Sequence, residues 1–431
     1  MQRLIFSLAL AAGVSAIGLF TPIAQAGDTK VNCNSPGANG KIANALSRLD
    51  PQASNVVHVR GSCHENLVIQ GFDQLSLVAE HGAAIEDASG GQLPTVEIRR
   101  SQLVAIEGFR IHGGRDGVLC GDMSSCRLTG LTVEDTQAGS GITFDGADGT
   151  LTRIVVHDAL NVGIAFWGAT IVASDVSIDG VKSTGAWPNG AGMVMSAGSV
   201  RNGPMNGPIA IQNADGPGIQ ELNGSIVDVS QLTLTYNGWG IWLANGATAT
   251  IGQLTAENNK IWGIVLDQGS NFNLYGANSV IRSNGAGIYV AGGASLYSYA
   301  GTTVTGNHTV GIQASDGARV YLGAGTTVAD HQVFGISVFS TASVYLYGAT
   351  ITATQQTGLY VAYPSFAFIY GGTFSDNGYL DISCDGPPPG VVVGIESAGT
   401  VKTDCVQPAL APNKLPKAVP IPPGPGSPPR T

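Results

Sequence analysis

Residues 311–334 read GIQASDGARVYLGAGTTVADHQVF, and segments of the same kind recur along the chain. Apolar residues alternate with polar ones in short runs, and Gly, Ala and Asp interrupt these runs every few residues. Alternation with a period of two, broken by turn residues, is typical of short half-buried strands. The segment therefore predicts strands and no helix.

A glycine followed by an aliphatic residue marks each repeat. Successive glycines from Gly240 to Gly358 are 23, 24, 24, 24 and 23 residues apart. A fixed period of this size predicts a solenoid in which each repeat forms one coil, with parallel strands about 4.8 Å apart. The same step continues upstream, with longer intervals of 29 and 26 residues that indicate insertions, at Gly117, Gly141, Gly163, Gly192 and Gly218.

This repeat resembles that of right-handed parallel β-helix proteins of the pectate-lyase-like type. They share the Gly-aliphatic step and an Asn-rich turn, which is found here at Asn237, Asn258, Asn284 and Asn307. The resemblance covers about residues 56–380 and implies an all-β, single-stranded right-handed parallel β-helix of about 11 or more coils. Lyases, hydrolases, esterases, epimerases and adhesins share this fold, so it does not decide the activity. The catalytic motifs of pectate lyases, polygalacturonases and pectin methylesterases are missing, so no catalytic residue is carried over.

Four segments are expected along the chain. Residues 1–26 have a basic start, an apolar run and a small-residue cleavage site, which predicts a signal peptide and a secreted or periplasmic protein. Residues 27–55 form an N-terminal cap, in which Ile42 and Leu46 predict a short amphipathic helix over the first coil. The β-helix takes residues 56–385. Residues 386–431 form a C-terminal cap segment and a disordered Pro-rich tail.

Six cysteines in a secreted chain predict disulfides, and they allow 15 pairings. Proximity in the sequence favours Cys33–Cys63, Cys120–Cys126 and Cys384–Cys405. Metal binding by these cysteines is the competing interpretation, but close Cys-x-x-Cys spacing is absent.

The composition limits the partners. The formal net charge is −10, only 12% of the residues are charged, and Gly accounts for 61 of 431. The basic footprint of a nucleic-acid-binding protein is absent. Beyond the signal, no apolar run is long enough to span a membrane.

Two aromatic rows are expected on one outer face of the C-terminal half. Counting from each glycine gives one row with Tyr297, Tyr321 and Tyr345, and a second row with Tyr299 and Tyr347. Such rings suit contact with sugars, but they can also form a stacked ladder with a purely structural role. Trp167 on the first outer strand, and Trp187 in the inserted segment 180–190, are further candidates for substrate contact.

The other candidate site is an acidic corner in the early coils. Asp145, His157, Asp158, Asp179 and Lys182 are expected to converge beneath the inserted segment, where they would act as acid and base or hold Ca²⁺. A plain solvated turn is the alternative. We therefore expect a secreted β-helix that binds or acts on a polysaccharide or cell-surface glycan, with lyase- or hydrolase-like chemistry at this corner. The alternatives are a non-catalytic adhesin, structural or glycan-binding β-helix, and ice binding by a threonine row (Thr303, Thr327, Thr350, Thr373).

Overall fold

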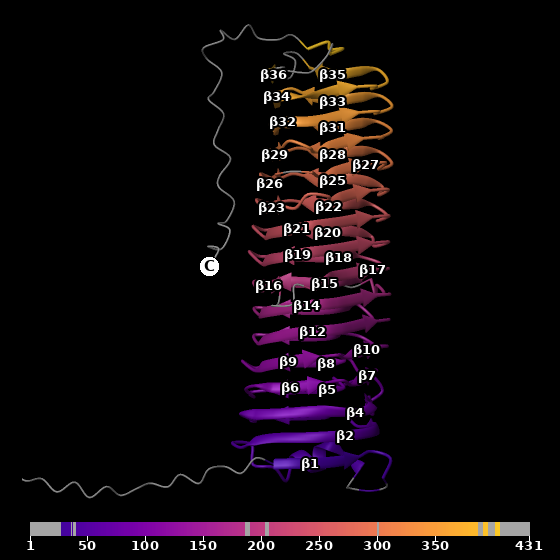
Figure 1. The fold of residues 1–431 in the computed structure, drawn as a ribbon, viewed down its shortest axis with the longest axis vertical. Coiled ribbons are helices and arrows are strands. Elements are labelled where there is room, and N and C mark those ends of the chain that lie inside the picture. Colours follow the sequence, from indigo (N-terminus) through magenta and orange to yellow (C-terminus); the bar gives the residue numbers. More distant parts are fainter. Residues whose placement is uncertain are drawn as a thin grey trace, which may run out of the picture.

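The computed structural model describes residues 27–35, 37, 40–185, 190–202, 207–299, 301–386, 391–394 and 401–405. The signal peptide expected at residues 1–26, Trp187 and the tail beyond residue 405 lie outside the described residues. The described chain winds into one right-handed stack of parallel strands that runs from β1 to β36 (Figure 1). The β-helix architecture predicted from the repeat is confirmed.

Face 1 of the stack is a sheet of 14 strands, one for each coil, and every pairing within it is parallel. Most of its strands begin at the Gly-aliphatic step. They are β3 (Leu67–Gln70), β5 (Val96–Arg99), β8 (Val118–Gly121), β11 (Ser140–Asp145), β13 (Val162–Trp167), β15 (Ala191–Ser196), β18 (Pro217–Leu222), β20 (Trp239–Leu243), β22 (Trp262–Leu266), β25 (Ala286–Val290), β28 (Val310–Ala314), β31 (Phe334–Val338), β33 (Thr357–Ala362) and β35 (Leu380–Asp385).

A second sheet of 22 strands covers faces 2 and 3. Its long strands bend from one face to the other: β2 (Ser54–His64), β4 (Gln74–Glu86), β12 (Asp148–His157), β14 (Thr170–Asp179), β19 (Ile226–Thr235), β21 (Thr248–Glu257), β32 (Ser343–Thr352) and β34 (Phe366–Ser375). Face 2 alone holds β1 (Gly27–Asn32), β6 (Val104–Glu107), β9 (Ser125–Thr129), β16 (Ser199–Asn202), β23 (Asn271–Leu274), β26 (Ser295–Ser298), β29 (Arg319–Leu322) and β36 (Val391–Val393). Face 3 alone holds β7 (Arg110–His112), β10 (Thr132–Glu134), β17 (Ile209–Gln212), β24 (Val280–Arg282), β27 (Thr303–Thr305) and β30 (Thr327–Ala329).

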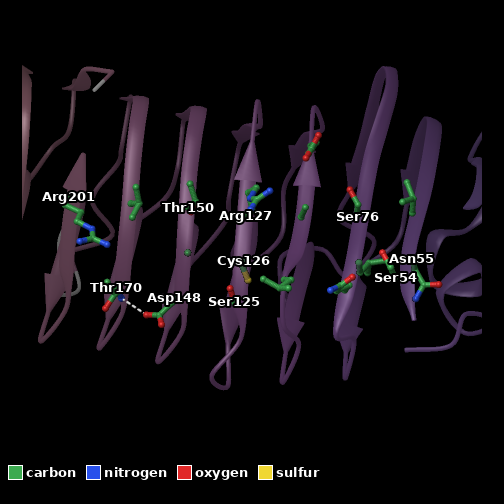
Figure 2. Close-up of a pocket in the computed structure, with 18 residues that line it drawn as sticks. Ser54, Asn55, Ser76, Ser125, Cys126, Arg127, Asp148, Thr150, Thr170 and Arg201 are labelled. Carbon is green, nitrogen blue, oxygen red and sulfur yellow. Dashed lines mark hydrogen bonds between the residues drawn. The ribbon is translucent and has the colours of Figure 1, made fainter. Parts of the chain in front are cut away.

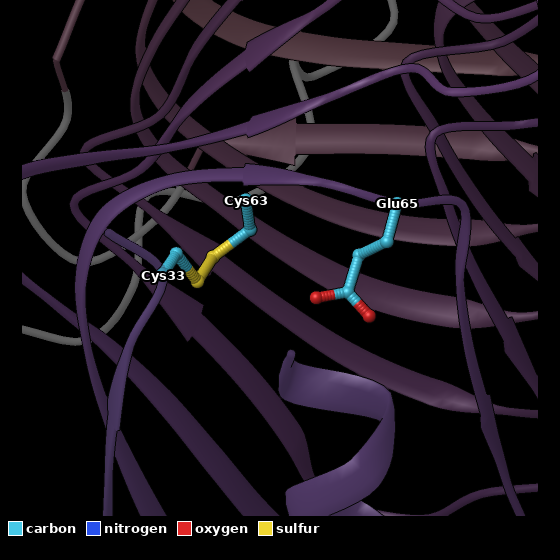
Figure 3. Close-up of side chains that lie close together, drawn as sticks. All are labelled: Cys33, Cys63 and Glu65. Carbon is cyan, nitrogen blue, oxygen red and sulfur yellow. A yellow bond between two sulfur atoms is a disulfide. The ribbon is translucent and has the colours of Figure 1, made fainter. Parts of the chain in front are cut away.

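The stack begins upstream of residue 56, because β1 already pairs with β2, from Gly27 opposite Asn55 to Asn32 opposite Arg60. The predicted capping helix is present as α1 (Ile42–Leu46), with Ile42 and Leu46 buried. Figure 3 shows Glu65 above the start of this helix, where its carboxylate accepts the backbone N–H groups of Ile42 at 2.7 Å and Ala43 at 3.0 Å. A carboxylate at this position satisfies donors that a helix start leaves unpaired.

The three disulfides predicted by proximity are present: Cys33–Cys63, Cys120–Cys126 and Cys384–Cys405. Cys33 and Cys63 lie close to Glu65 (Figure 3), in an arrangement of potential metal ligands. Because the disulfide leaves no thiolate there, this group is a structural cap and does not form a metal site.

The interior is a series of stacked aliphatic rows. The isoleucines of the Gly-aliphatic step are at most 1% exposed and lie opposite one another in register: Ile241, Ile264, Ile288, Ile312 and Ile336. The preceding glycine is needed because a Cβ at Gly287 would lie 2.2 Å from the carbonyl oxygen of Gly311. The sequence prediction of this core is confirmed.

Buried amides link the later coils along the inner corner between faces 3 and 1. This Asn ladder consists of Asn237, Asn259, Asn284 and Asn307, each at most 2% exposed. The backbone N–H of each of the first three donates to the Oδ1 of the next, at 2.9 to 3.1 Å. His331 continues the ladder, and burial lowers its pKa, so the ring stays neutral.

The Asn-rich turn expected from the sequence is correct at Asn237, Asn284 and Asn307 and wrong at Asn258. Asn258 has a φ of 56° and lies at the turn, while Asn259 points inward. In the early coils the ladder position holds Thr136, Ala159 and Val181, and there only the backbone carbonyls of these residues accept an N–H group from the next coil. Charged residues therefore do not replace the amides. They lie two residues earlier, on an outer row.

One carboxylic acid lies inside the apolar core. Glu221 of β18 is 1% exposed, is paired in register with Met195 and Leu243, and neither of its side-chain oxygens has a hydrogen-bond partner. Burial raises the pKa of Glu221 well above its ordinary value of 4.5. The neutral acid is the form that the folded protein holds.

Glu221→Gln should remove a pH-dependent loss of stability. Between pH 4.5 and the raised pKa, the unfolded chain carries an ionised Glu221 and the folded chain a neutral one. The contribution of Glu221 to stability is therefore complete below about pH 4.5 and falls by about 1.4 kcal/mol per pH unit above it. Urea unfolding of both proteins from pH 4.5 to 8 measures the difference. Parallel stability curves would show that Glu221 ionises freely in the folded state.

Asn284→Ala should destabilise the protein by at least about 2 kcal/mol, because buried donors on the neighbouring coil lose their acceptor. Asn284 Oδ1 accepts the backbone N–H of Asn259 at 2.9 Å and its side-chain amide at 2.8 Å. The matched control is Asn258→Gly, which suits the positive φ and removes no buried hydrogen bond. Thermal or urea unfolding should show a large loss for the first variant and less than about 0.5 kcal/mol for the second. Equal losses would exclude a special role of the ladder.

Candidate functional site

A row of alternating histidine and carboxylate side chains follows the outer corner where face 3 ends. Each member lies opposite the next in register across neighbouring coils. This corner row consists of His64, Glu86, His112, Glu134, His157 and Asp179. Because histidines separate the acids, no two carboxylates of the row are direct neighbours.

The contacts along the corner row are close. His64 Nδ1 is 3.1 Å from Glu86 Oε2, and His112 Nδ1 is 3.4 Å from Glu134 Oε1. The other oxygen of Glu134 lies 3.7 Å from Nε2 of His157. Glu134 is therefore placed between two imidazoles, which is a setting for proton transfer or cation binding.

Three of the predicted catalytic residues meet at the end of this row. His157 Nδ1 is 3.6 Å from Asp158 Oδ2, and the backbone N–H of Asp158 donates to the carbonyl of Asp179 at 3.1 Å. Asp179 accepts hydrogen bonds from Gln212 at 3.0 Å and Asn213 at 2.7 Å, one on each oxygen. Both oxygens are thus engaged, so Asp179 is a poor candidate for a free base.

The other predicted members of the site lie apart from one another. Lys182 is exposed and forms an isolated bridge with Leu160. Asp145 is the last residue of β11, opposite Trp167, five residues beyond the start of the strand at Ser140. At about 3.3 Å per residue, that is about 17 Å along face 1. The structure therefore does not bring Asp145 to the corner row, and Trp187 lies outside the described residues.

Sequence reasoning missed His64, Glu86 and His112. The turn between face 3 and the next glycine varies in length, so counting back from the glycine loses the register. His112 lies five residues before Gly117, Glu134 seven before Gly141, and Asp179 thirteen before Gly192. Alternation of His and Glu at intervals of 22 to 26 residues is the signal that could have revealed the row.

A shallow pocket of about 550 Å³ follows face 2 of the N-terminal half. Its lining comes from seven consecutive coils, from β2 to β16, so this face-2 groove is about 29 Å long at 4.8 Å per strand. Figure 2 shows Arg127 and Arg201 on the same row, and the strands β12 and β14 lie between them. Hydroxyl and amide groups supply much of the rest: Ser54, Asn55, Gln74, Ser76, Ser125, Thr150 and Thr170.

The charged side chains of the face-2 groove differ in the contacts that they make. Asp148 accepts the backbone N–H of Thr170 at 3.2 Å (Figure 2). Among the residues that the structure describes, Arg127 and Arg201 form no ion pair with a carboxylate. Both side chains are exposed. Arg201 lies opposite Asp228 on the next coil, whereas the neighbours of Arg127 in register are Ala105 and Thr150. Arg127 is therefore the guanidinium group that is more readily available to an incoming anion.

The predicted aromatic row continues face 2 in the C-terminal half. Tyr297, Tyr321, Tyr345 and Phe368 stack with ring centroids 4.5 to 4.8 Å apart and planes within 8° of parallel. In this Tyr ladder the neighbouring rings cover the ring faces, so the edges and hydroxyls are the parts available to a ligand. Burial, together with the neighbouring tyrosines, raises the pKa of Tyr321 to about 12, so its hydroxyl stays neutral.

A second pocket, of about 620 Å³, lies beside the Tyr ladder on the same face. Its lining includes Arg319, Tyr321, Tyr345 and Ser343. Tyr321 occupies the row that holds Arg127 and Arg201 further down the stack, as the pairings from coil to coil show. Arginines thus line a pocket on face 2 in each half of the described chain.

Within the described residues, no helix is long and apolar enough to span a bilayer. No curated protein sequence matches the chain.

Comparison with solved structures finds several proteins of low sequence identity to this chain. The periplasmic alginate epimerase AlgG is 12% identical, with 86% of this chain and 84% of that chain covered and a TM-score of 0.29. The A-module of the Azotobacter vinelandii mannuronan C-5 epimerase AlgE6 is 14% identical, with 86% and 100% covered and a TM-score of 0.39. An alginate lyase from Paenibacillus sp. str. FPU-7 is 14% identical, with 78% and 96% covered and a TM-score of 0.31.

A family profile for the right-handed β-helix region matches residues 173–326. That segment lies inside the stack of parallel coils described above. The chain is a right-handed parallel β-helix protein.

Proposed function

We propose that this chain is a secreted protein that binds an extended acidic polysaccharide along face 2. The observation that carries the proposal is the face-2 groove, which is open and about 29 Å long, with many polar side chains and two exposed arginines. The three disulfides support secretion, because such bonds persist in oxidising compartments.

The arginines favour a ligand with carboxylate or sulfate groups. Arg127 and Arg201 are separated by Thr150 and Val172 in register, which makes three coil spacings, or about 14 Å. A guanidinium binds a carboxylate through two parallel hydrogen bonds. The chain is acidic overall, with a formal net charge of −10, and Glu107 and Asp148 balance the two arginines within the groove. An acidic glycan would therefore be held by direct guanidinium contacts and not by a net positive field.

The groove is better suited to holding a glycan than to cleaving it. Its two carboxylates, Glu107 and Asp148, lie on rows four residues apart and on coils two apart, which is about 16 Å. Paired carboxylates of glycoside hydrolases are about 5 to 9.5 Å apart. Hydroxyls, amides and arginines without such a pair favour binding.

The second candidate is an enzyme that uses the corner row. His157 lies between Glu134 and Asp158, at 3.7 and 3.6 Å, so two carboxylates flank one imidazole. Such a group can take and return a proton during lyase- or hydrolase-like cleavage. This version requires the glycan to reach the corner of face 3.

The first test measures binding of the untagged mature chain to a panel of polyuronates, sulfated glycans and neutral glycans. Replacing Arg127 and Arg201 by Ala should weaken binding of the acidic glycans at least tenfold, because both charge-assisted contacts are lost. Added salt should weaken binding as well. The matched control is Arg48→Ala, which removes an exposed arginine that does not line the groove.

Two results would count against this proposal. Equal affinity of the double variant and the wild type would remove the face-2 groove from recognition. Unsaturated products or new reducing ends that disappear in His157→Gln would favour the enzyme at the corner row.

The second test separates the two interpretations of the Tyr ladder. Tyr321→Phe keeps the ring in the stack and removes the hydroxyl, so thermal stability should stay unchanged while glycan affinity falls several-fold. Tyr321→Ala should lower both. Tyr236→Phe is the control, because Tyr236 is 57% exposed and lies outside the ladder. If Tyr321→Phe binds the glycan like the wild type, the ladder has a structural role alone.

A further inference from the structure

The corner row contains one place where three potential metal ligands converge. His112 ends β7, Glu134 ends β10 directly opposite it, and Asp135 follows with a φ of 56°. The Nδ1 atom of His112 is 3.4 Å from Glu134 Oε1 and 3.3 Å from Asp135 Oδ2. One ligand atom from each residue lies within 4.8 Å of the other two.

The two separations from Nδ1 of His112 match the edges of a small tetrahedral coordination shell. Zinc bonds to imidazole nitrogen and carboxylate oxygen are about 2.0 to 2.2 Å long, which puts neighbouring ligand atoms about 3.3 to 3.5 Å apart. A charge-assisted hydrogen bond would be shorter, at about 2.7 to 2.9 Å. His112 Nδ1 is therefore too far from both carboxylates for a good hydrogen bond, yet it is placed to share a cation with them.

The environment of the Nδ1 atom of His112 also favours a bound cation at this place. Its Nδ1 atom is buried and has no hydrogen-bond partner, although the ring itself is partly exposed. Buried polar atoms in proteins are almost always satisfied, and an orphaned one calls for an explanation. A cation held between Nδ1 and the two carboxylates satisfies all three groups.

The surroundings leave space for further ligands. A cavity of about 160 Å³ lies beside His112 and is lined by Ala84, Glu86, Arg110 and His112. Arg110 also contacts Glu134 Oε1 through its Nε. That oxygen can accept from Arg110 and still bind a metal, because a carboxylate oxygen has more than one lone pair. The nearby positive charge of Arg110 weakens cation binding.

The neighbouring positions of the row fit a metal less well. His64 Nδ1 faces Glu86 alone, at 3.1 Å. Around His157 the nearest carboxylate oxygens are 3.6 and 3.7 Å away and face different ring nitrogens. Only at His112, among the described residues of the row, does a single nitrogen face two carboxylates.

We propose that His112, Glu134 and Asp135 bind one divalent first-row transition-metal ion, with zinc as the reference ion. A mixture of imidazole and carboxylate ligands suits such ions better than Ca²⁺ or Mg²⁺, which prefer oxygen ligands alone. This site is separate from the face-2 groove and does not depend on glycan binding.

The test uses the mature chain without a histidine tag, stripped with chelator and titrated with zinc chloride by calorimetry. One equivalent should bind, and the melting temperature should rise as the ion binds the folded state. His112→Gln and Asp135→Asn should each weaken binding at least tenfold; Asn keeps the positive φ of position 135 accessible. Arg110→Gln should bind zinc more tightly than the wild type, because a repelling charge is removed.

The matched control is His64→Gln, which removes a histidine of the same row and should leave the zinc affinity unchanged. Without metal, each variant should melt within a few degrees of the wild type, which separates loss of a ligand from loss of the fold. Zinc binding that is equally strong in His112→Gln and the wild type would overturn the proposal. So would stronger binding of Ca²⁺ than of zinc, since oxygen ligands alone would then suffice.

Discussion

Parallel pairing in register places each side chain about 4.8 Å from its equivalent in the next coil. A residue that is repeated along the stack must therefore pack well against itself. The Ile rows do so through apolar contact, the Asn ladder through amide hydrogen bonds, and the Tyr ladder through parallel rings. Charged groups cannot, so the corner row alternates imidazoles with carboxylates.

This constraint also separates structural rows from rows that are free to bind. On face 2, the row that forms the Tyr ladder in the C-terminal half holds Arg127, Thr150, Val172 and Arg201 in the N-terminal half. Thr150 and Val172 gain little from their neighbours, so Arg127 remains available to a ligand, whereas Arg201 lies opposite Asp228 on the next coil. The threonine row of face 3, with Thr303 opposite Thr327, shows the opposite case of regular repetition.

The glycine period was sufficient to predict the fold and the buried isoleucines, because the step at Gly287 has a single steric cause. Proximity in the sequence was sufficient to predict which cysteines pair in the three disulfides. The corner row was only partly predicted, since turns of variable length break the count between His112 and the following glycine. Asn258 and Asn259 could not be told apart, because backbone conformation alone decides which one points inward. The glycine count does place Glu221 inside, three residues after Gly218 as Leu243 is after Gly240, but its charge argued against that position.

The two kinds of row respond differently to a change in the number of coils. Loss of residues 284–306 would bring Asn259 next to Asn307, and the amide links would close again unchanged. Loss of residues 112–133 would instead place Glu86 against Glu134, two carboxylates in direct contact across the sheet. The C-terminal half can therefore grow or shrink by single coils. Within the corner row from His64 to His157, the alternation of imidazole and carboxylate is kept only when coils are gained or lost in pairs.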